Sequence, residues 1–242
     1  GDESGALKML GTNTISGPVS LNAGLIDVDE SAKLSGKLSL DGSAEIDVAS
    51  GKTLTYDNAS VSLEGYILTL SGEGTLANTN ALLLDTASSL LKLTDNGTID
   101  NVSVTADLVD DKGLKISSAS SITLLSLSAS TPVAIDPGQI LSGSINVQAG
   151  GTLKLTDNGP LASSVVLKGG TLDVNESMTS NGSISLSEDS TIDIAQGKKL
   201  KYRGDNVSIG PYKLSLAGTG TLSNDHFLNL DNANSQVAFA GA

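Results

Sequence analysis

Carboxylates recur in this sequence at a spacing that suits a divalent cation. The interval between Asp27 and Asp47 is repeated in the second half of the chain by Asp173 and Asp193. If one turn of a repeating fold takes about 20 residues, each pair lies on adjacent strands, where like charges repel. A hard cation such as Ca²⁺, which prefers oxygen ligands, would compensate the charges. The alternative is that the carboxylates are solvated on an outer wall, in which case a chelator leaves the melting temperature unchanged.

Paired carboxylates also serve glycoside hydrolysis, which some parallel β-helix enzymes carry out. Sites of that kind gather Asp with Arg, Lys or His, and this chain holds one His and one Arg, His226 and Arg203. At the matching positions 146 residues earlier stand Asn80 and Asp57, so the pair is not a repeated feature. We expect His226 to be a loop residue rather than a general base, and the protein not to be an enzyme.

All four tyrosines form two duplicated pairs. Tyr56 and Tyr202 end strand-like triplets and are expected to face inward or close a corner. Tyr66 and Tyr212 lie in bends, where an exposed ring could stack on a sugar; packing at a corner is the alternative. Threonines are scattered, which argues against the flat ladder that ice-binding solenoids use; those considered are Thr12, Thr14, Thr53, Thr55, Thr219 and Thr221.

Composition excludes several classes of partner. The formal net charge is −13, so the chain is badly suited to grip a phosphate backbone or an anionic lipid surface. No apolar run approaches the ~20 residues of a spanning helix, which predicts no membrane insertion. Cysteine is absent, which excludes disulfides and thiolate chemistry. Aromatic residues are 2% of the chain, which favours a narrow stack filled by aliphatic side chains over a wide, irregular core.

Triplets that alternate apolar, polar and apolar residues recur along the whole chain. Examples are Ile26-Asp27-Val28, Leu38-Ser39-Leu40 and Leu54-Thr55-Tyr56. Period-two alternation predicts short strands buried on one side. The segments between triplets are rich in Gly, Asn, Asp and Ser, which favour tight bends. The sequence therefore predicts an all-β fold with almost no helix.

One approximate turn length accounts for three repeat distances. Leu7-Lys8-Met9 corresponds to Leu91-Lys92-Leu93, which returns as Leu153-Lys154-Leu155, and the stretch 46–76 returns as 192–222. A turn of about 21 residues fits these distances as four, three and seven turns. We therefore predict a parallel β-solenoid with three short strands per turn and about eleven turns. A two-domain β-sandwich is the alternative, although its strands are usually longer than these triplets.

The repeat also defines the expected domain organisation. We expect one continuous solenoid over residues 1–242, with residues 6–96 repeated at 152–242 and an irregular middle at 97–151. Val237-Ala238-Phe239 aligns with Leu91-Lys92-Leu93, so the chain ends within a repeat and is expected to be a fragment of a longer array.

Several features of the sequence are shared with a known class of proteins. They are polar bends, a single Arg, no Cys, and units such as Gly151-Thr152-Leu153-Lys154-Leu155 and Gly170-Thr171-Leu172-Asp173-Val174. The chain resembles the β-helical stalks of extracellular surface proteins, namely autotransporter passengers and filamentous-haemagglutinin-type adhesins. This resemblance implies an extracellular or cell-surface, structural or adhesive, filament-forming module. Expected partners are surface glycans or proteins and further copies associating end to end. A phage or virion fibre and a polysaccharide-binding or polysaccharide-cleaving β-helix are the alternatives.

Overall fold

The computed structural model describes residues 5–95, 97–109, 113–116, 121–128, 133–135, 143–156, 158–205 and 207–240. These residues form a parallel β-solenoid of about ten turns with roughly 22 residues per turn, which confirms the predicted fold class. Among the described residues there is no helix, and therefore none that could cross a membrane. Strands of successive turns pair in parallel, as β1 (Ala6–Met9) does with β4 (Leu25–Val28) and β19 (Thr152–Leu155) with β21 (Thr171–Val174), which rules out the sandwich alternative.

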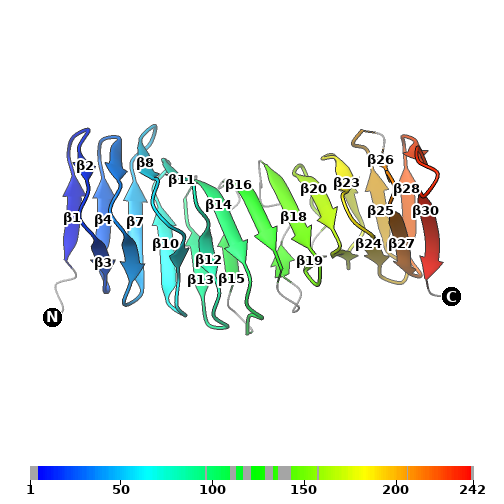
Figure 1. The fold of residues 1–242 in the computed structure, drawn as a ribbon, viewed down its shortest axis with the longest axis horizontal. Helices are drawn as coiled ribbons and strands as arrows, with labels where there is room; N and C mark the ends of the chain where they lie inside the picture. The colour runs from blue at the N-terminus through cyan, green and yellow to red at the C-terminus, as the bar shows by residue number, and fades with distance from the viewer. Residues whose placement is uncertain are drawn as a thin grey trace. The chain divides into compact units, whose positions relative to one another are not determined.

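The chain divides into two compact units, residues 1–124 and 125–242. In the first unit, the first wall is a ladder of parallel strands that lie side by side (Figure 1): β1 (Ala6–Met9), β4 (Leu25–Val28), β7 (Ala44–Val48), β10 (Ile67–Ser71), β13 (Leu90–Leu93) and β15 (Gly113–Ile116). Its second wall contains β2 (Thr14–Ile15), β5 (Ala32–Leu34), β8 (Thr53–Tyr56), β11 (Thr75–Asn78) and the start of β14 (Thr98–Val104). Its third wall contains β3 (Val19–Leu21), β6 (Leu38–Leu40), β9 (Val61–Ser62), β12 (Leu82–Leu84) and the end of β14.

The second unit repeats this plan. Its first wall is β17 (Val133–Ile135), β19 (Thr152–Leu155), β21 (Thr171–Val174), β24 (Ser190–Ile194), β27 (Lys213–Gly218) and β30 (Gln236–Ala240). Its second wall is β22 (Met178–Ser180), β25 (Lys199–Tyr202) and β28 (Thr221–Asn224). Its third wall is β18 (Ser144–Gln148), β20 (Ser164–Lys168), β23 (Ile184–Leu186), β26 (Val207–Ser208) and β29 (Leu228–Asn229). Strand β16 (Ser121–Leu127) includes the boundary between the two units.

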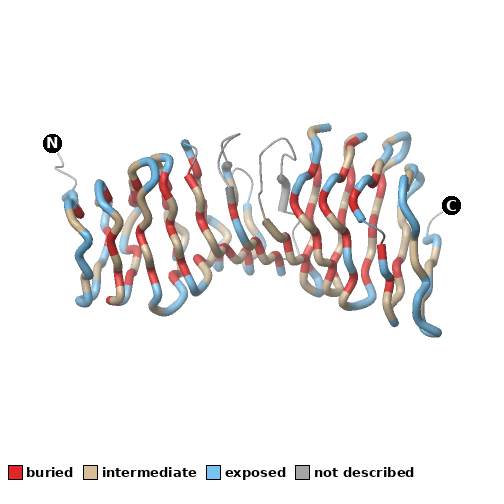
Figure 2. Tube along the Cα trace, turned by 90° about the horizontal axis from the view of Figure 1, so that it is seen from above, coloured by how far each residue is buried: buried red, intermediate tan, exposed pale blue. Residues whose placement is uncertain are grey.

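The core of each unit consists of aliphatic side chains stacked from turn to turn. On the first wall of the first unit, Ile26, Ile46, Leu70 and Leu93 are register partners on adjacent strands, and each is at most 2% exposed. Buried residues alternate with more exposed ones along strands such as β7 and β21 (Figure 2). Fully burying such a side chain stabilises the fold by about 1.5–3 kcal/mol, so each turn gains its stability from the turn next to it.

Turn length is not constant, which explains the small difference from the predicted length and number of turns. Ala6 pairs with Leu25, whereas Ala44 pairs with Leu68 over a visibly longer stretch of sequence. The extra residues are accommodated in the bends between strands, because the strands themselves stay in register. An average of roughly 22 residues per turn gives about ten turns.

The duplication extends to individual contacts. In the first unit, the Lys52 ammonium lies 2.6 Å from the Glu30 carboxylate, and in the second unit Lys198 lies 2.6 Å from Glu176. Position 36 requires glycine because the backbone of the preceding turn is close, and a Cβ on Gly36 would be 1.8 Å from the Gly17 carbonyl oxygen. Its copy Gly182 is in the same situation, with 1.9 Å to the Ser163 carbonyl oxygen.

Two bends of the first unit place a non-glycine residue in the left-handed region, and the second unit has glycine at both matching positions. Ala23 has φ 54° and Glu64 has φ 49°. Their copies are Gly169, with φ 84°, and Gly210, with φ 59°. Left-handed backbone costs an ordinary L-residue roughly 1–2 kcal/mol, and glycine avoids that cost.

Replacing Glu64 by Gly should therefore stabilise the protein. The relieved backbone strain exceeds the extra chain entropy that glycine has when unfolded, so we expect a net gain of about 0.5–1 kcal/mol and a rise in melting temperature of about 1–4 °C. Thermal unfolding followed by circular dichroism measures it. Glu64→Ala is the matched control, because it removes the charge but keeps the strain. An equal gain from Glu64→Ala would contradict the explanation.

Candidate functional site

The predicted aspartates are brought together on the outer face of the first wall. In the first unit, Lys8 of β1 pairs in register with Asp27 of β4, which pairs with Asp47 of β7. The Lys8 ammonium lies 2.6 Å from the Asp27 carboxylate, whose side chain is 17% exposed. The sequence therefore predicted the adjacency of the two carboxylates correctly, and Lys8 already compensates part of their charge.

Asp47 has more acidic surroundings than Asp27. Burial raises the pKa of its carboxyl above the ordinary value of 3.8, and the negative charges of Asp27, Glu45, Asp95 and Asp29 raise it further. Each of these effects makes the ionised form of Asp47 less favourable in the folded state.

The second unit repeats the row with fewer carboxylates around it. Lys154, Asp173 and Asp193 are register partners on β19, β21 and β24. The residue matching Asp29 is Asn175, and its side-chain amide donates a hydrogen bond of 2.6 Å to the Asp173 carboxylate. The residue matching Glu45 is Thr191. The two copies therefore provide a matched comparison between a crowded and a relieved aspartate pair.

Within the part of the chain that the structure describes, no group of three or more His, Cys, Asp or Glu side chains is arranged to hold a metal ion. Each of the two predicted pairs, Asp27 with Asp47 and Asp173 with Asp193, offers two carboxylates on adjacent strands. A calcium ion bound there would need further oxygen ligands, because calcium takes six to eight. The calcium hypothesis stays a prediction.

The tyrosines separate into two structural roles. Tyr56 and Tyr202 are buried, and each phenolic oxygen accepts a hydrogen bond from the backbone N–H of the preceding turn, Leu38 at 3.3 Å and Ile184 at 3.2 Å. Burial raises the pKa of Tyr202. Tyr66 and Tyr212 are half-buried at the bend that enters the first wall. Each of these two residues is thus partly exposed, and glycan contact there stays a prediction.

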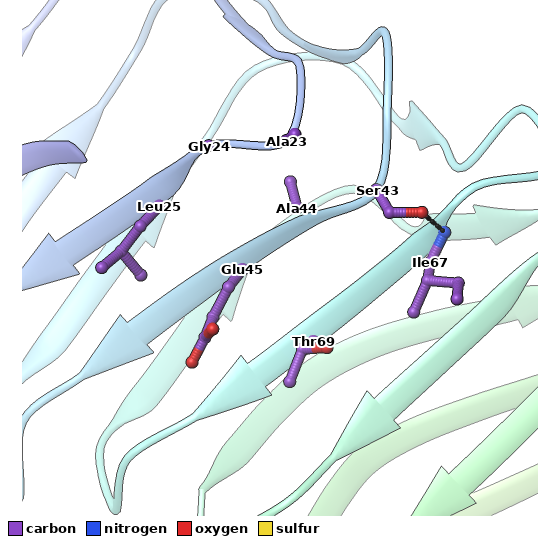
Figure 3. A pocket seen from close by; sticks show the side chains of 8 residues that line it. All are labelled: Ala23, Gly24, Leu25, Ser43, Ala44, Glu45, Ile67 and Thr69. Carbon is purple, nitrogen blue, oxygen red and sulfur yellow. Dashed lines mark hydrogen bonds between the residues drawn. The ribbon is translucent and has the colours of Figure 1, made fainter. Parts of the chain in front are cut away.

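A shallow hollow of about 340 Å³ opens on the first wall of the first unit (Figure 3). Leu25, Glu45 and Thr69 lie along it on adjacent strands. Ser43 Oγ accepts a hydrogen bond from the Ile67 N–H at 3.1 Å, and Glu45 accepts one from Ser71 Oγ at 2.5 Å. Glu45 is the titratable residue among those that line the hollow.

Arg203 and His226 are both near the Asp225 carboxylate at the end of the second wall of the second unit, since Arg203 forms an ion pair with Asp225 and His226 is the next residue of the chain. Arg203 Nε and Lys201 Nζ are each 3.3 Å from the Asp225 carboxylate. Desolvation raises the pKa of Asp225, but the hydrogen bonds and charges of Lys201 and Arg203 outweigh it and hold the pKa below 3.8. His226 is exposed in the bend that follows, as expected for a loop residue.

Two features of the outer walls were not predicted from the sequence. Single threonines stack in register, as Thr53–Thr75–Thr98 in the first unit and Thr152–Thr171–Thr191 in the second, although within the described pairings none of the six threonines considered for ice binding is a register partner of another. The second row runs beside the charged row of Lys154, Asp173 and Asp193. The other feature is the concentration of cations on β25, whose sequence signal is alternation of basic and apolar residues.

Replacing Asp47 by Asn should stabilise the protein at neutral pH. An aspartate whose folded-state pKa is raised destabilises the fold above that pKa, and the penalty disappears as the pH falls towards 3.8. We expect the melting temperature to rise by about 1–2 °C at pH 7, since the site is partly solvated, and hardly at all near pH 4. Asp193→Asn is the matched control and should give less. A gain independent of pH would contradict this account.

Comparison with known proteins adds no relative to this picture. No family model, curated protein or solved structure matches the chain. The β-solenoid is established by the structure, and the resemblance to adhesin and autotransporter repeats stays a hypothesis about what the solenoid does.

Proposed function

We propose that this chain is a structural and adhesive repeat module of an extracellular, cell-surface or filament-forming protein. The observation that carries the proposal is the alternation along strands such as β4 and β21, which places aliphatic side chains inside and polar side chains outside. A fold of this kind extends by adding turns, because each turn needs only the next one to complete its core. Such a fold mainly provides length and accessible surface.

The described sites favour this role over catalysis. The hollow on the first wall is shallow and has one titratable lining residue, Glu45. In the aspartate row, Lys8 already forms an ion pair with Asp27. Hydrolysis by paired carboxylates requires one group to donate a proton while the other acts on the opposite side of the substrate. Side chains on adjacent strands of one flat wall face the same side and lack that arrangement.

Surface location is tested on intact cells that produce the protein. Antibodies raised against the purified chain should label unpermeabilised cells, and protease added outside should remove the label. The comparison is an internal protein of the same cells, which should be labelled only after permeabilisation. If the chain itself were labelled only after permeabilisation, the proposed location would be wrong.

We also propose that copies of this chain associate end to end. Within the described residues, β30 is hydrogen-bonded on one side only, to β27. Phe239 of β30 occupies the position that matches buried Leu93, yet it is 83% exposed. A hollow of about 420 Å³ lies beside it, lined partly by Ile194, Leu216 and Leu222. An unpaired strand edge with exposed apolar side chains is a template for further pairing.

Sedimentation of the purified chain over a range of concentrations tests this association. We expect reversible growth with concentration, and Phe239→Ser should weaken it at least about tenfold, because a large apolar group is lost from the contact. Phe227→Ser is the matched control, since Phe227 is 75% exposed but lies in the bend between the second and third walls. A monomer at all concentrations would contradict end-to-end association, and a defined trimer would favour the virion-fibre alternative.

A further inference from the structure

The second wall of the second unit carries a row of cations on strand β25 and the residues on either side of it. Lys198, Lys199, Lys201 and Arg203 are four of the 14 basic residues of a chain whose net charge is −13. Leu200 and Tyr202 of β25 are buried at 0% and 1% exposure. Since side chains alternate along a strand, Lys199 and Lys201 point outward together, with Cα atoms about 6.6–6.8 Å apart. Arg203, the residue after β25, is exposed as well.

Hydroxyl groups flank this cationic row on both sides. Lys201 pairs in register with Thr179 of β22 and with Ser223 of β28. Lys199 pairs with Thr221, and its backbone N–H donates to Ser177 Oγ at 3.1 Å. Strands β25 and β28 lie side by side (Figure 1). The wall therefore presents a line of positive charge between two lines of hydrogen-bonding groups.

The charges of this row are only partly neutralised. Lys198 is paired with Glu176 at 2.6 Å, and a single carboxylate, Asp225, serves both Lys201 and Arg203. Among the described residues, the Lys199 ammonium has no ion-pair or hydrogen-bond partner. Asp205, in the bend after Arg203, is a further negative charge near the end of the row. The Lys201–Arg203 pair already holds a carboxylate, and Lys199 is available for another.

The fold does not require these cations. In the first unit, the positions of Lys199, Lys201 and Arg203 are occupied by Thr53, Thr55 and Asp57. The inward residues are unchanged in kind, with Leu54 and Tyr56 buried as their copies are. The basic row therefore distinguishes the outer surfaces of two walls that share one backbone plan.

We infer that the second wall of the second unit, centred on Lys199, Lys201 and Arg203, binds an acidic polysaccharide whose charges are uronate carboxylates. The cations attract the carboxylates, and the flanking Ser and Thr side chains hydrogen-bond to sugar hydroxyls. Phe227, two residues beyond Asp225 and 75% exposed, offers an aromatic face at the edge of the wall for a sugar ring.

A uronate polymer fits this wall better than a nucleic acid does. Double-stranded DNA carries one charge per about 1.7 Å of its axis, and the acidic remainder of the chain repels so dense a polyanion. A polysaccharide with one carboxylate per sugar has more widely spaced charges and many hydroxyls. The inference rests on the proposed extracellular role in one respect, namely that the protein would meet such a polymer outside the cell. Binding by the purified chain does not depend on that role.

Titration calorimetry of the whole chain with oligogalacturonate tests the inference. We expect saturable binding that weakens as salt is added, and no binding to a neutral galactan of equal length. Lys199→Thr, Lys201→Thr and Arg203→Gln together remove the three charges, the first two by installing the side chains of the first unit, and should weaken binding at least about tenfold. The melting temperature should change little, since the substitutions are on the outer surface and keep the buried Leu200 and Tyr202.

Two further variants keep the inference falsifiable. Asp225→Asn removes the competing carboxylate, so it should tighten binding, whereas loss of a merely structural ion pair would not. Lys33→Thr in the first unit, where Lys33 pairs with Asp57 at 2.6 Å, is the matched control and should leave binding unchanged. Unchanged binding in the triple variant, or equal binding to duplex DNA, would overturn the inference and leave the structural role of the solenoid intact.

Discussion

The structure depends on parallel pairing between successive turns, in register. Once the backbone of one turn is hydrogen-bonded to the next, each inward side chain must lie directly on the equivalent side chain about 4.8 Å away. Ile26, Ile46, Leu70 and Leu93 show the result, a continuous aliphatic row of almost fully buried residues. A polar group in such a row would have no water, and its neighbours above and below would have no polar atom to offer. The constraint therefore acts on the inside of the solenoid and leaves the outside free to vary.

The internal duplication shows that freedom directly. Elements that hold turns together occur in both units, such as the buried Tyr56 and Tyr202 hydroxyls and the Lys52–Glu30 and Lys198–Glu176 ion pairs. Outward positions differ in charge. Residues 6–96 contain five basic and 11 acidic residues, whereas residues 152–242 contain seven basic and nine acidic ones. One backbone plan thus carries two electrostatically different surfaces, and comparing matched positions separates what the fold needs from what a ligand would need.

Much of the fold could be predicted from the sequence, because alternation and repetition are local signals. The triplets gave the strands, and the repeat distances gave parallel stacking and the adjacency of Asp27 with Asp47. The register of other rows could not be predicted, because short and long turns occur in one chain and their average does not locate a given pair. For this reason the row Thr53–Thr75–Thr98 was missed. Left-handed backbone at Glu64 was hidden as well, since glutamate gives no sign of it and only its copy, Gly210, does.

The same reasoning explains why the outer surface is the place to look for function in this protein. A compact enzyme builds its site where several elements converge, and its core residues help to shape that site. In a solenoid wall, neighbouring side chains are instead repeated at the spacing of the strands, so the natural ligand is one that also repeats. A polymer matches that geometry, because each added turn extends the contact by a similar increment. Lys199, Lys201 and Arg203 form such a series along β25 and the residue that follows it, while the Ser and Thr side chains beside them continue it across strands.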